Sequence, residues 1–109
     1  MRKKLSLSQL KKYDVSQKVL DALADVQSRA ILFSVIKKGK TAAELAEDHR
    51  IPLSSVYKKI SELEDLTLLK VERWILSDSG RKFKVYRSRI SRAEVSIRKS
   101  EPVISLSPN

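Results

Sequence analysis

Cysteine is absent from this 109-residue chain, histidine occurs once, at His49, and glycine occurs only twice. Because zinc and other soft metals are held by several thiolates or imidazoles, the sequence predicts no metal site and no thiol redox chemistry. Neither GxGxxG nor GxxxxGKS/T occurs, so a phosphate-cradling loop is not expected. The apolar runs are only a few residues long, and the basic start lacks the apolar stretch of a secretory signal. A soluble, cytoplasmic protein is therefore predicted.

The sequence also lacks a recognisable catalytic set. The neighbouring carboxylates Glu47-Asp48 and Glu64-Asp65 are adjacent in sequence, so on a helix each pair diverges. The single histidine falls in a polar turn, where we expect it to be solvated, and no Ser–His–Asp arrangement is evident. We therefore predict that the protein is not an enzyme and uses no cofactor.

Positive charge is abundant and lies at the two ends. The chain has 23 Lys and Arg against 13 Asp and Glu, a net charge of +10, and 41% hydrophobic residues, enough for one folded domain. Residues 1–12 carry five of the basic residues and no acid, residues 81–100 carry eight with only Glu94, and residues 14–80 are nearly neutral. This distribution favours a polyanionic partner, with nucleic acid ahead of an acidic membrane surface.

The first half of the chain reads as a series of helices. Residues 1–12 are predicted to form a basic arm, followed by a helix from Asp14 to about Ala24. A second, buried helix is expected from an N-cap at Asp25 to a stop at Lys38-Gly39. Thr41 and Glu44 have the spacing of a capping box and predict a short third helix over residues 42–48.

A fourth helix is predicted over residues 53–66, after a turn and Pro52. Leu53, Val56, Ile60 and Leu63 form its apolar stripe. Two short helices joined by a tight turn, the second of them amphipathic, are typical of a helix-turn-helix, and the second would be the recognition helix.

After residue 66 the hydrophobic period changes from helical to alternating. Turn residues 77–80 separate two alternating segments, so residues 68–76 and 81–88 are predicted to form a β-hairpin. A hairpin that directly follows a recognition helix is a wing. The expected fold is therefore α+β: a helical bundle followed by a β-hairpin wing, over residues 13–90. Residues 91–109 alternate more weakly and predict either a second hairpin or an extended arm.

Several of these segments together resemble one family. Residues 23–32 resemble the opening of the second helix of ArsR-like winged-helix regulators, residues 41–46 their first helix-turn-helix segment, residues 51–63 their recognition helix, and residues 80–86 the returning wing strand. The resemblance covers about residues 14–90 and is closest to archaeal regulators. It implies a homodimeric transcription regulator with the recognition helix in the major groove and the wing along the DNA backbone. It does not imply a metal response, because the thiols and paired histidines of the metal-sensing branch are missing.

The candidate DNA-contacting residues lie on the recognition helix, at its approach and on the wing. Ser54, Ser55 and Lys58 are predicted to point outward from a helix half that has no acid, and their donors suit phosphates and base edges. The whole set is Thr41, Ser54, Ser55, Tyr57, Lys58, Lys59, Arg73, Arg81, Lys82 and Lys84. Tyr57 could instead pack, and Trp74 is expected to pack the hairpin onto the body rather than to enter a groove.

Two alternatives to binding of double-stranded DNA stay open. A winged helix can serve as a protein–protein module, but the outer face of residues 53–66 is predicted to carry Ser and Lys rather than an apolar patch. RNA-binding modules usually expose aromatic residues for stacking, whereas the few aromatics here lie mostly at core-like positions. The apolar residues of the first helix and of the tail exceed what one small domain can bury, so a homodimer is expected.

Overall fold

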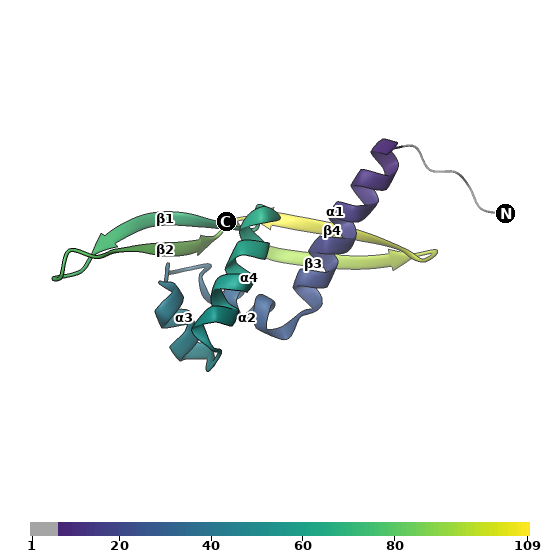
Figure 1. Ribbon diagram of the computed structural model, residues 1–109. Coiled ribbons are helices and arrows are strands. Elements are labelled where there is room, and N and C mark those ends of the chain that lie inside the picture. The colour runs from purple at the N-terminus through teal and green to yellow at the C-terminus, as the bar shows by residue number, and fades with distance from the viewer. Residues whose placement is uncertain (1–6) are drawn as a thin grey trace.

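The computed structural model describes the backbone of residues 7–109 and the side chains of residues 15–109. Four helices are followed by two β-hairpins that extend from the helices in opposite directions (Figure 1). The molecule is elongated, with extents of 63 × 25 × 23 Å. Its elements are α1 (Leu7–Ala24), α2 (Val26–Ser34), α3 (Ala42–His49), α4 (Leu53–Asp65), β1 (Leu69–Leu76), β2 (Lys82–Ser88), β3 (Ile90–Arg98) and β4 (Glu101–Pro108).

Helix α1 begins at Leu7, so the prediction of a start at Asp14 is wrong. The second half of the expected arm is therefore helical, and residues 1–6 of that arm lie outside the described residues. Asp25 is the N-cap of α2, as predicted. No helix among residues 7–109 is long and apolar enough to cross a membrane.

Helix α2 ends at Ser34, several residues before the predicted stop at Lys38-Gly39. The reason is that residues 35–40 run along the first hairpin and pair with it. Lys40 exchanges backbone hydrogen bonds of 3.1 and 2.8 Å with Tyr86, and the Ser88 N–H donates to the Val35 carbonyl at 3.0 Å. A helix continuing to residue 38 would lose these bonds and the close approach of Gly39 to the sheet.

The predicted capping box at the start of α3 is confirmed. The Thr41 hydroxyl accepts from the Glu44 N–H, and the Glu44 carboxylate accepts from the Thr41 N–H. Arg50 closes α3 in the left-handed region with φ 53°, and Pro52 is the N-cap of α4. The core lies between the helices and the base of the first hairpin, and its most deeply buried side chains include Ile31, Leu32, Val35, Leu45, Val56, Ile60, Leu63 and Leu68.

The first hairpin is the predicted wing. Strands β1 and β2 pair antiparallel, with the Ser77 N–H donating to the Arg81 carbonyl at 2.8 Å across the turn and Gly80 at φ 83°. A β-bulge at Glu72 interrupts the register between Val71, which faces Tyr86, and Arg73, which faces Val85. The bulge shifts the alternation of β1 by one residue, and this shift decides which side chains of β1 face α4.

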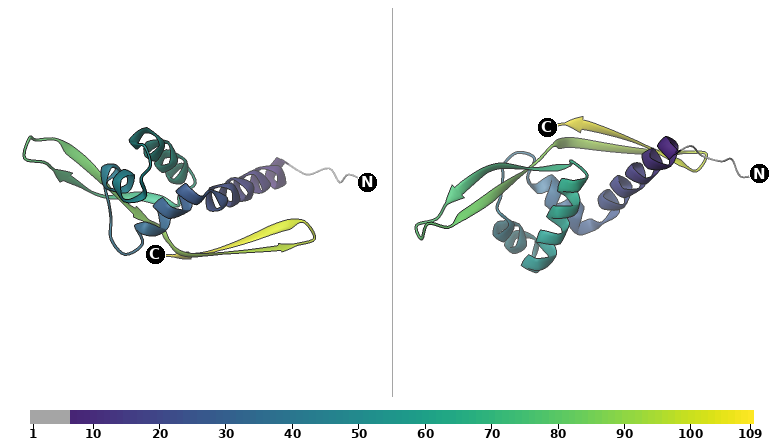
Figure 2. Two further views of the ribbon diagram at one scale, coloured as in Figure 1. Left: turned by 90° about the horizontal axis from the view of Figure 1, so that it is seen from below. Right: turned by 45° about the horizontal axis from the view of Figure 1, so that its top comes forward.

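The tail forms a second antiparallel hairpin, β3–β4, one of the two predicted alternatives. Its turn consists of Lys99 and Ser100, both in the left-handed region. Only Arg89 separates β2 from β3. Helix α1 lies beside this hairpin (Figures 1 and 2), and the contacts between α1 and β4 hold the two together.

Candidate nucleic-acid interface

The outer face of α4 carries hydroxyl and ammonium groups. Val56, Ile60 and Leu63 face the core, which turns Ser54 and Lys58 to the solvent, with Ser55 half-buried beside them. The first two turns of α4 contain no acidic residue, so the positive end of the helix dipole reinforces the lysine charge there. This face can approach a polyanion without a like-charge penalty.

Lys59 does not belong to this outer face. Its ammonium donates to the Asp25 carboxylate at 2.8 Å, and the same carboxylate oxygen accepts from the N–H and hydroxyl of Ser28 at 2.9 and 2.8 Å. These bonds lower the pKa of Asp25 to about 2, with the bond from Lys59 contributing most. The structure therefore places Lys59 in an ion pair that fastens α4 to the start of α2, away from the other candidate residues.

Thr41 is also occupied within the fold. It is buried, and its hydroxyl belongs to the capping box at the start of α3. Its position beside the wing follows from the Lys40–Tyr86 pairing one residue earlier. Thr41 therefore positions the helix-turn-helix against the wing rather than presenting its hydroxyl at the surface.

Two cations of the second wing strand, Lys82 and Lys84, lie on the face of the wing that turns toward α4. Lys82 and Lys84 alternate with Phe83 and Val85 along β2 and share the face of Tyr86, which packs into the core. The Lys84 ammonium lies 5.4 Å from the centre of the Trp74 ring, a cation–π contact between paired strand positions. Arg81, in the turn, is exposed.

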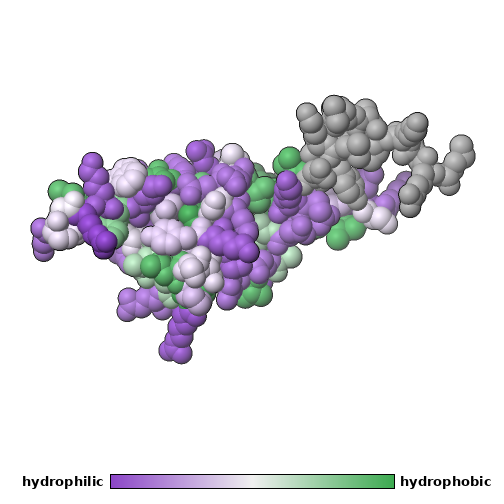
Figure 3. All heavy atoms as spheres, viewed as in Figure 1, coloured by the Kyte–Doolittle hydropathy of each residue, from purple (hydrophilic) through white to green (hydrophobic). Residues whose placement is uncertain are grey.

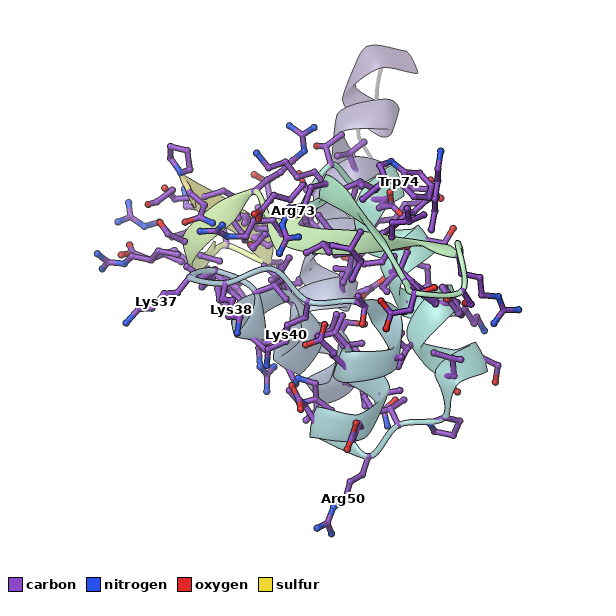
Figure 4. All side chains as sticks on the ribbon, turned by 90° about the vertical axis from the view of Figure 1, so that its left-hand side faces the viewer. Lys37, Lys38, Lys40, Arg50, Arg73 and Trp74 are labelled. Atoms are coloured by element: carbon purple, nitrogen blue, oxygen red, sulfur yellow. The ribbon has the colours of Figure 1, made fainter. Side chains whose placement is uncertain are left out.

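Arg73 lies on the other face of the wing. The bulge places it opposite Val85, on the side of the loop that carries Lys37 and Lys38, whereas Trp74 lies on the side of α4 (Figure 4). Strict alternation from Val71 would have put Arg73 toward α4. Of the predicted wing residues, the structure brings Arg81, Lys82 and Lys84 together and separates Arg73 from them.

A groove of about 590 Å³ separates α4 and the start of α3 from the wing. Leu53 and Tyr57 line its helical side, and Trp74, Lys82 and Lys84 line its wing side. Three sequence predictions fail here. Leu53, expected in the core stripe, is 45% exposed, and Trp74, expected to pack on the body, is 57% exposed. Tyr57 and Phe83 are exposed as well, so the aromatics are not confined to core-like positions.

Sequence reasoning could not identify Trp74 and Leu53 as groove residues, for a physical reason. The position of Trp74 depends on the bulge, which has no signature in a strand rich in charged residues. Leu53 follows the N-cap Pro52, and its side chain at the first turn projects past the end of the core into the groove. The two residues meet at one site only because of the strand register of the wing, and local sequence patterns do not determine that register.

His49 differs from expectation, since it is half-buried and its Nε2 atom is enclosed without a hydrogen-bond partner among the described residues. Across residues 15–109, no cluster of three or more His, Asp or Glu side chains is arranged to hold a metal ion.

Four helices, a helix-turn-helix and an antiparallel hairpin directly after it define an α+β winged helix-turn-helix protein. Among solved structures, NolR from Sinorhizobium fredii is similar: the alignment covers 80% of this chain and 81% of NolR, with a TM-score of 0.63 and 21% sequence identity. No protein-family model matches the chain, and no curated protein does so. The structural similarity is one of fold.

Proposed function

We propose that the protein binds double-stranded DNA in a sequence-specific manner and regulates transcription, and that it is not an enzyme. Helix α4 would lie in the major groove and the β1–β2 wing along the backbone. The observation that carries the proposal is the basic wing beside the N-terminal half of α4: Arg81, Lys82 and Lys84 line the groove across from Leu53 and Tyr57, and Ser54 and Lys58 are exposed on the same two turns of that helix.

The two parts of this face have different tasks. Ser54, Ser55 and Lys58 project from a helix of a width that the major groove admits, where hydroxyls and lysine read base edges. The wing cations sit on a hairpin beside that helix, where they meet phosphates and supply affinity that does not depend on sequence. A protein that regulates transcription in this way would be located in the cytoplasm, at the nucleoid.

The alternatives have less support. A protein-binding winged helix would be expected to show a continuous apolar outer face on α4, whereas here Ser54 and Lys58 are exposed beside Leu53 and Tyr57. Helix α4 does not favour duplex RNA as the ligand either, because the deep and narrow major groove of an RNA duplex excludes a helix. The ArsR-like resemblance and the archaeal assignment rest on the sequence motifs.

We also propose a homodimer built on α1 and the second hairpin. The register of β3–β4 puts Ala93, Val95 and Ile97 on the same face as Pro102, Ile104 and Leu106. Ala93 and Ile104 pack against the core, but Ile97 is 67% exposed and Val95 is exposed. Figure 3 shows hydrophobic residues at the surface over this hairpin. A second copy that covers this face would remove apolar surface from water.

Selection of bound duplexes from a random pool tests the proposed function. The wild-type protein should enrich a defined motif, and Lys58→Ala should change or broaden it, because a base contact of this kind contributes about 1–3 kcal/mol of discrimination. Arg98→Ala is the matched control, since it removes an exposed cation at the far end of the second hairpin. Uniform recovery of all sequences by the wild type, or a motif that Lys58→Ala leaves unchanged, would refute the assigned role of α4.

A further inference from the structure

The groove between α4 and the wing exposes more aromatic surface than contact with phosphates requires. Tyr57 is 51% exposed on the helical side, and Trp74 is exposed on the wing side. An exposed indole forgoes one of the largest hydrophobic gains available to a side chain. A phosphate contact by Lys82 or Arg81 gains nothing from a neighbouring indole, so the ring needs a ligand of a different chemistry.

Trp74 is accessible from two directions. Its ring lines the main groove and also a second hollow of about 390 Å³ that it shares with Ile75, Leu76 and Lys82. The cation–π contact with Lys84 places an ammonium group beside the indole ring. An aromatic platform among lysines is the combination with which proteins bind unpaired nucleobases, whose flat faces stack while the cations contact the phosphates.

The charged residues that line the groove would orient a nucleotide bound in it. Glu64 lies on the helical side, where its charge repels phosphates, and Arg81 and Lys82 lie on the wing side, where they attract them. A nucleotide in the groove would therefore turn its phosphate toward Arg81 and Lys82, and the edge of a base stacked on Trp74 would face Glu64 of α4. A carboxylate accepts hydrogen bonds from exocyclic amino groups, so Glu64 favours cytosine over thymine.

We propose that this groove binds single-stranded DNA, with an unpaired base stacked on Trp74 and the adjoining phosphates held by Lys82 and Arg81. The choice of DNA over RNA rests on the proposed function, because the groove adjoins the helix assigned to duplex DNA. A strand locally opened beside the duplex site would supply such a base. The groove adds an affinity that major-groove recognition neither requires nor predicts.

The chain contains a single tryptophan and three tyrosines, so emission excited at a wavelength that tyrosine does not absorb reports on Trp74 alone. Oligonucleotides of about 12 nucleotides, oligo-dC, oligo-dT and oligo-rC, span a site of the usual size. Titration with oligo-dC should quench the Trp74 emission to saturation, and oligo-dT should need a higher concentration. A fully paired duplex should quench it much less at equal occupancy, which is measured through the anisotropy of a labelled strand.

Variants separate stacking from charge. With labelled oligo-dC, Trp74→Leu should weaken binding about tenfold, whereas Trp74→Phe should retain most of it because a flat ring remains. Val26→Ala, which shortens an exposed apolar side chain of α2, should leave binding unchanged. Glu64→Gln should reduce the preference for oligo-dC over oligo-dT. Circular dichroism checks that each variant is folded.

The outcomes are distinguishable from failure of the proposed function. Duplex binding that persists while oligo-dC gives no quenching, or while Trp74→Leu binds oligo-dC as tightly as wild type, overturns this inference alone. Equal quenching by duplex and single strand at equal occupancy overturns it too, because the groove would then hold a paired strand. Tighter binding of oligo-rC than of oligo-dC overturns the assignment to DNA. Loss of duplex binding with intact quenching by oligo-dC instead removes the proposed function.

Discussion

Asp25 illustrates how one side chain can hold two helices. It caps the N-terminus of α2 through Ser28 and pairs with Lys59 of α4, although its side chain is 43% exposed. Its contribution to stability comes mainly from local geometry, because exposure to solvent weakens the ion pair. The same carboxylate orients the helix on which the proposed recognition residues stand.

Substitutions at Asp25 separate the cap from the ion pair. Asp25→Ala should lower the free energy of unfolding by about 1 kcal/mol, the usual cost of a lost N-cap. Asp25→Asn keeps an acceptor for the Ser28 N–H and should cost less. Because the folded pKa is about 2 against 3.8 for an unperturbed aspartate carboxyl, the stability from ionised Asp25 is present above about pH 4 and is lost as the pH falls through about 2. Chemical denaturation between pH 2 and 6 measures this. An equal pH dependence in wild type and Asp25→Asn would contradict it.

The two glycines make opposite demands. A Cβ on Gly39 would lie 2.6 Å from the Val85 side chain and 3.2 Å from the Tyr86 carbonyl oxygen, whereas a Cβ on Gly80 would meet nothing within 4 Å. Gly39 is therefore needed for close approach, and Gly80 for its φ of 83°.

We expect Gly39→Ala to lower the free energy of unfolding by about 1–3 kcal/mol, because Val85 is buried and stiff. Gly80→Ala should cost about 1 kcal/mol through backbone strain, and Gly80→Asn less, because Asn tolerates the left-handed region. Thermal denaturation of the three variants tests the distinction. A stable Gly39→Ala protein would show that residues 35–40 can retreat from the wing.

At the scale of elements, the wing should supply affinity and α4 specificity. Lys82→Ala should weaken binding to all duplexes by a similar factor and lower the slope of log K against log salt by about one, because one phosphate contact is lost. Binding measured by anisotropy at several salt concentrations, on a selected and an unrelated duplex, gives both quantities. Arg98→Ala, on the other hairpin, provides the comparison. A loss confined to the selected duplex would assign Lys82 to base reading instead.

The sequence predicted those elements whose signals are local. The capping box of Thr41 and Glu44, the N-cap at Asp25 and the turn at residues 77–80 are all present, since each depends on neighbours a few residues away. The end of α2 was wrong because residues 35–40 are drawn out of the helix by pairing with β2, a partner far along the chain.

The candidate site was predictable in its helix and less so in its wing. Ser54 and Lys58 lie outward, as the helical period of the buried residues required. The exchange of Arg73 and Trp74 across the sheet results from a single bulge at Glu72, which the alternation pattern could not reveal. The pairing of Lys59 with Asp25 likewise joins two residues that no local rule connects.

At the scale of the whole molecule, the two hairpins lie at opposite ends of the long axis. The first lies beside α4, and the second lies beside α1 at the other end of the long axis (Figure 2). The proposed DNA contact and the proposed self-association therefore use separate surfaces, and substitutions on one should leave the other unchanged.

Ile97→Glu tests the proposed dimer. The wild type should sediment at micromolar concentration with twice its mass of 12.4 kDa, and Ile97→Glu should sediment as a monomer, because it places a charge on the apolar face. Val26→Glu, which replaces an exposed valine on α2, is the matched control and should remain dimeric. A wild-type monomer both with and without DNA would remove the proposed dimer.

The short junction between β2 and β3 restricts how the two hairpins can move relative to each other. Only Arg89 lies between them, and the junction is fixed on both sides: the buried Ser88 hydroxyl donates to the Ile90 carbonyl, and the Asn109 side chain donates to the Ser88 carbonyl at 2.9 Å. Few torsion angles are thus free to change the angle between the hairpins. If the second hairpins of two copies join, the distance between their wings is set by this junction rather than by a flexible linker. The spacing of the two halves of an operator would then be encoded at Ser88–Ile90, far from any residue that reads a base.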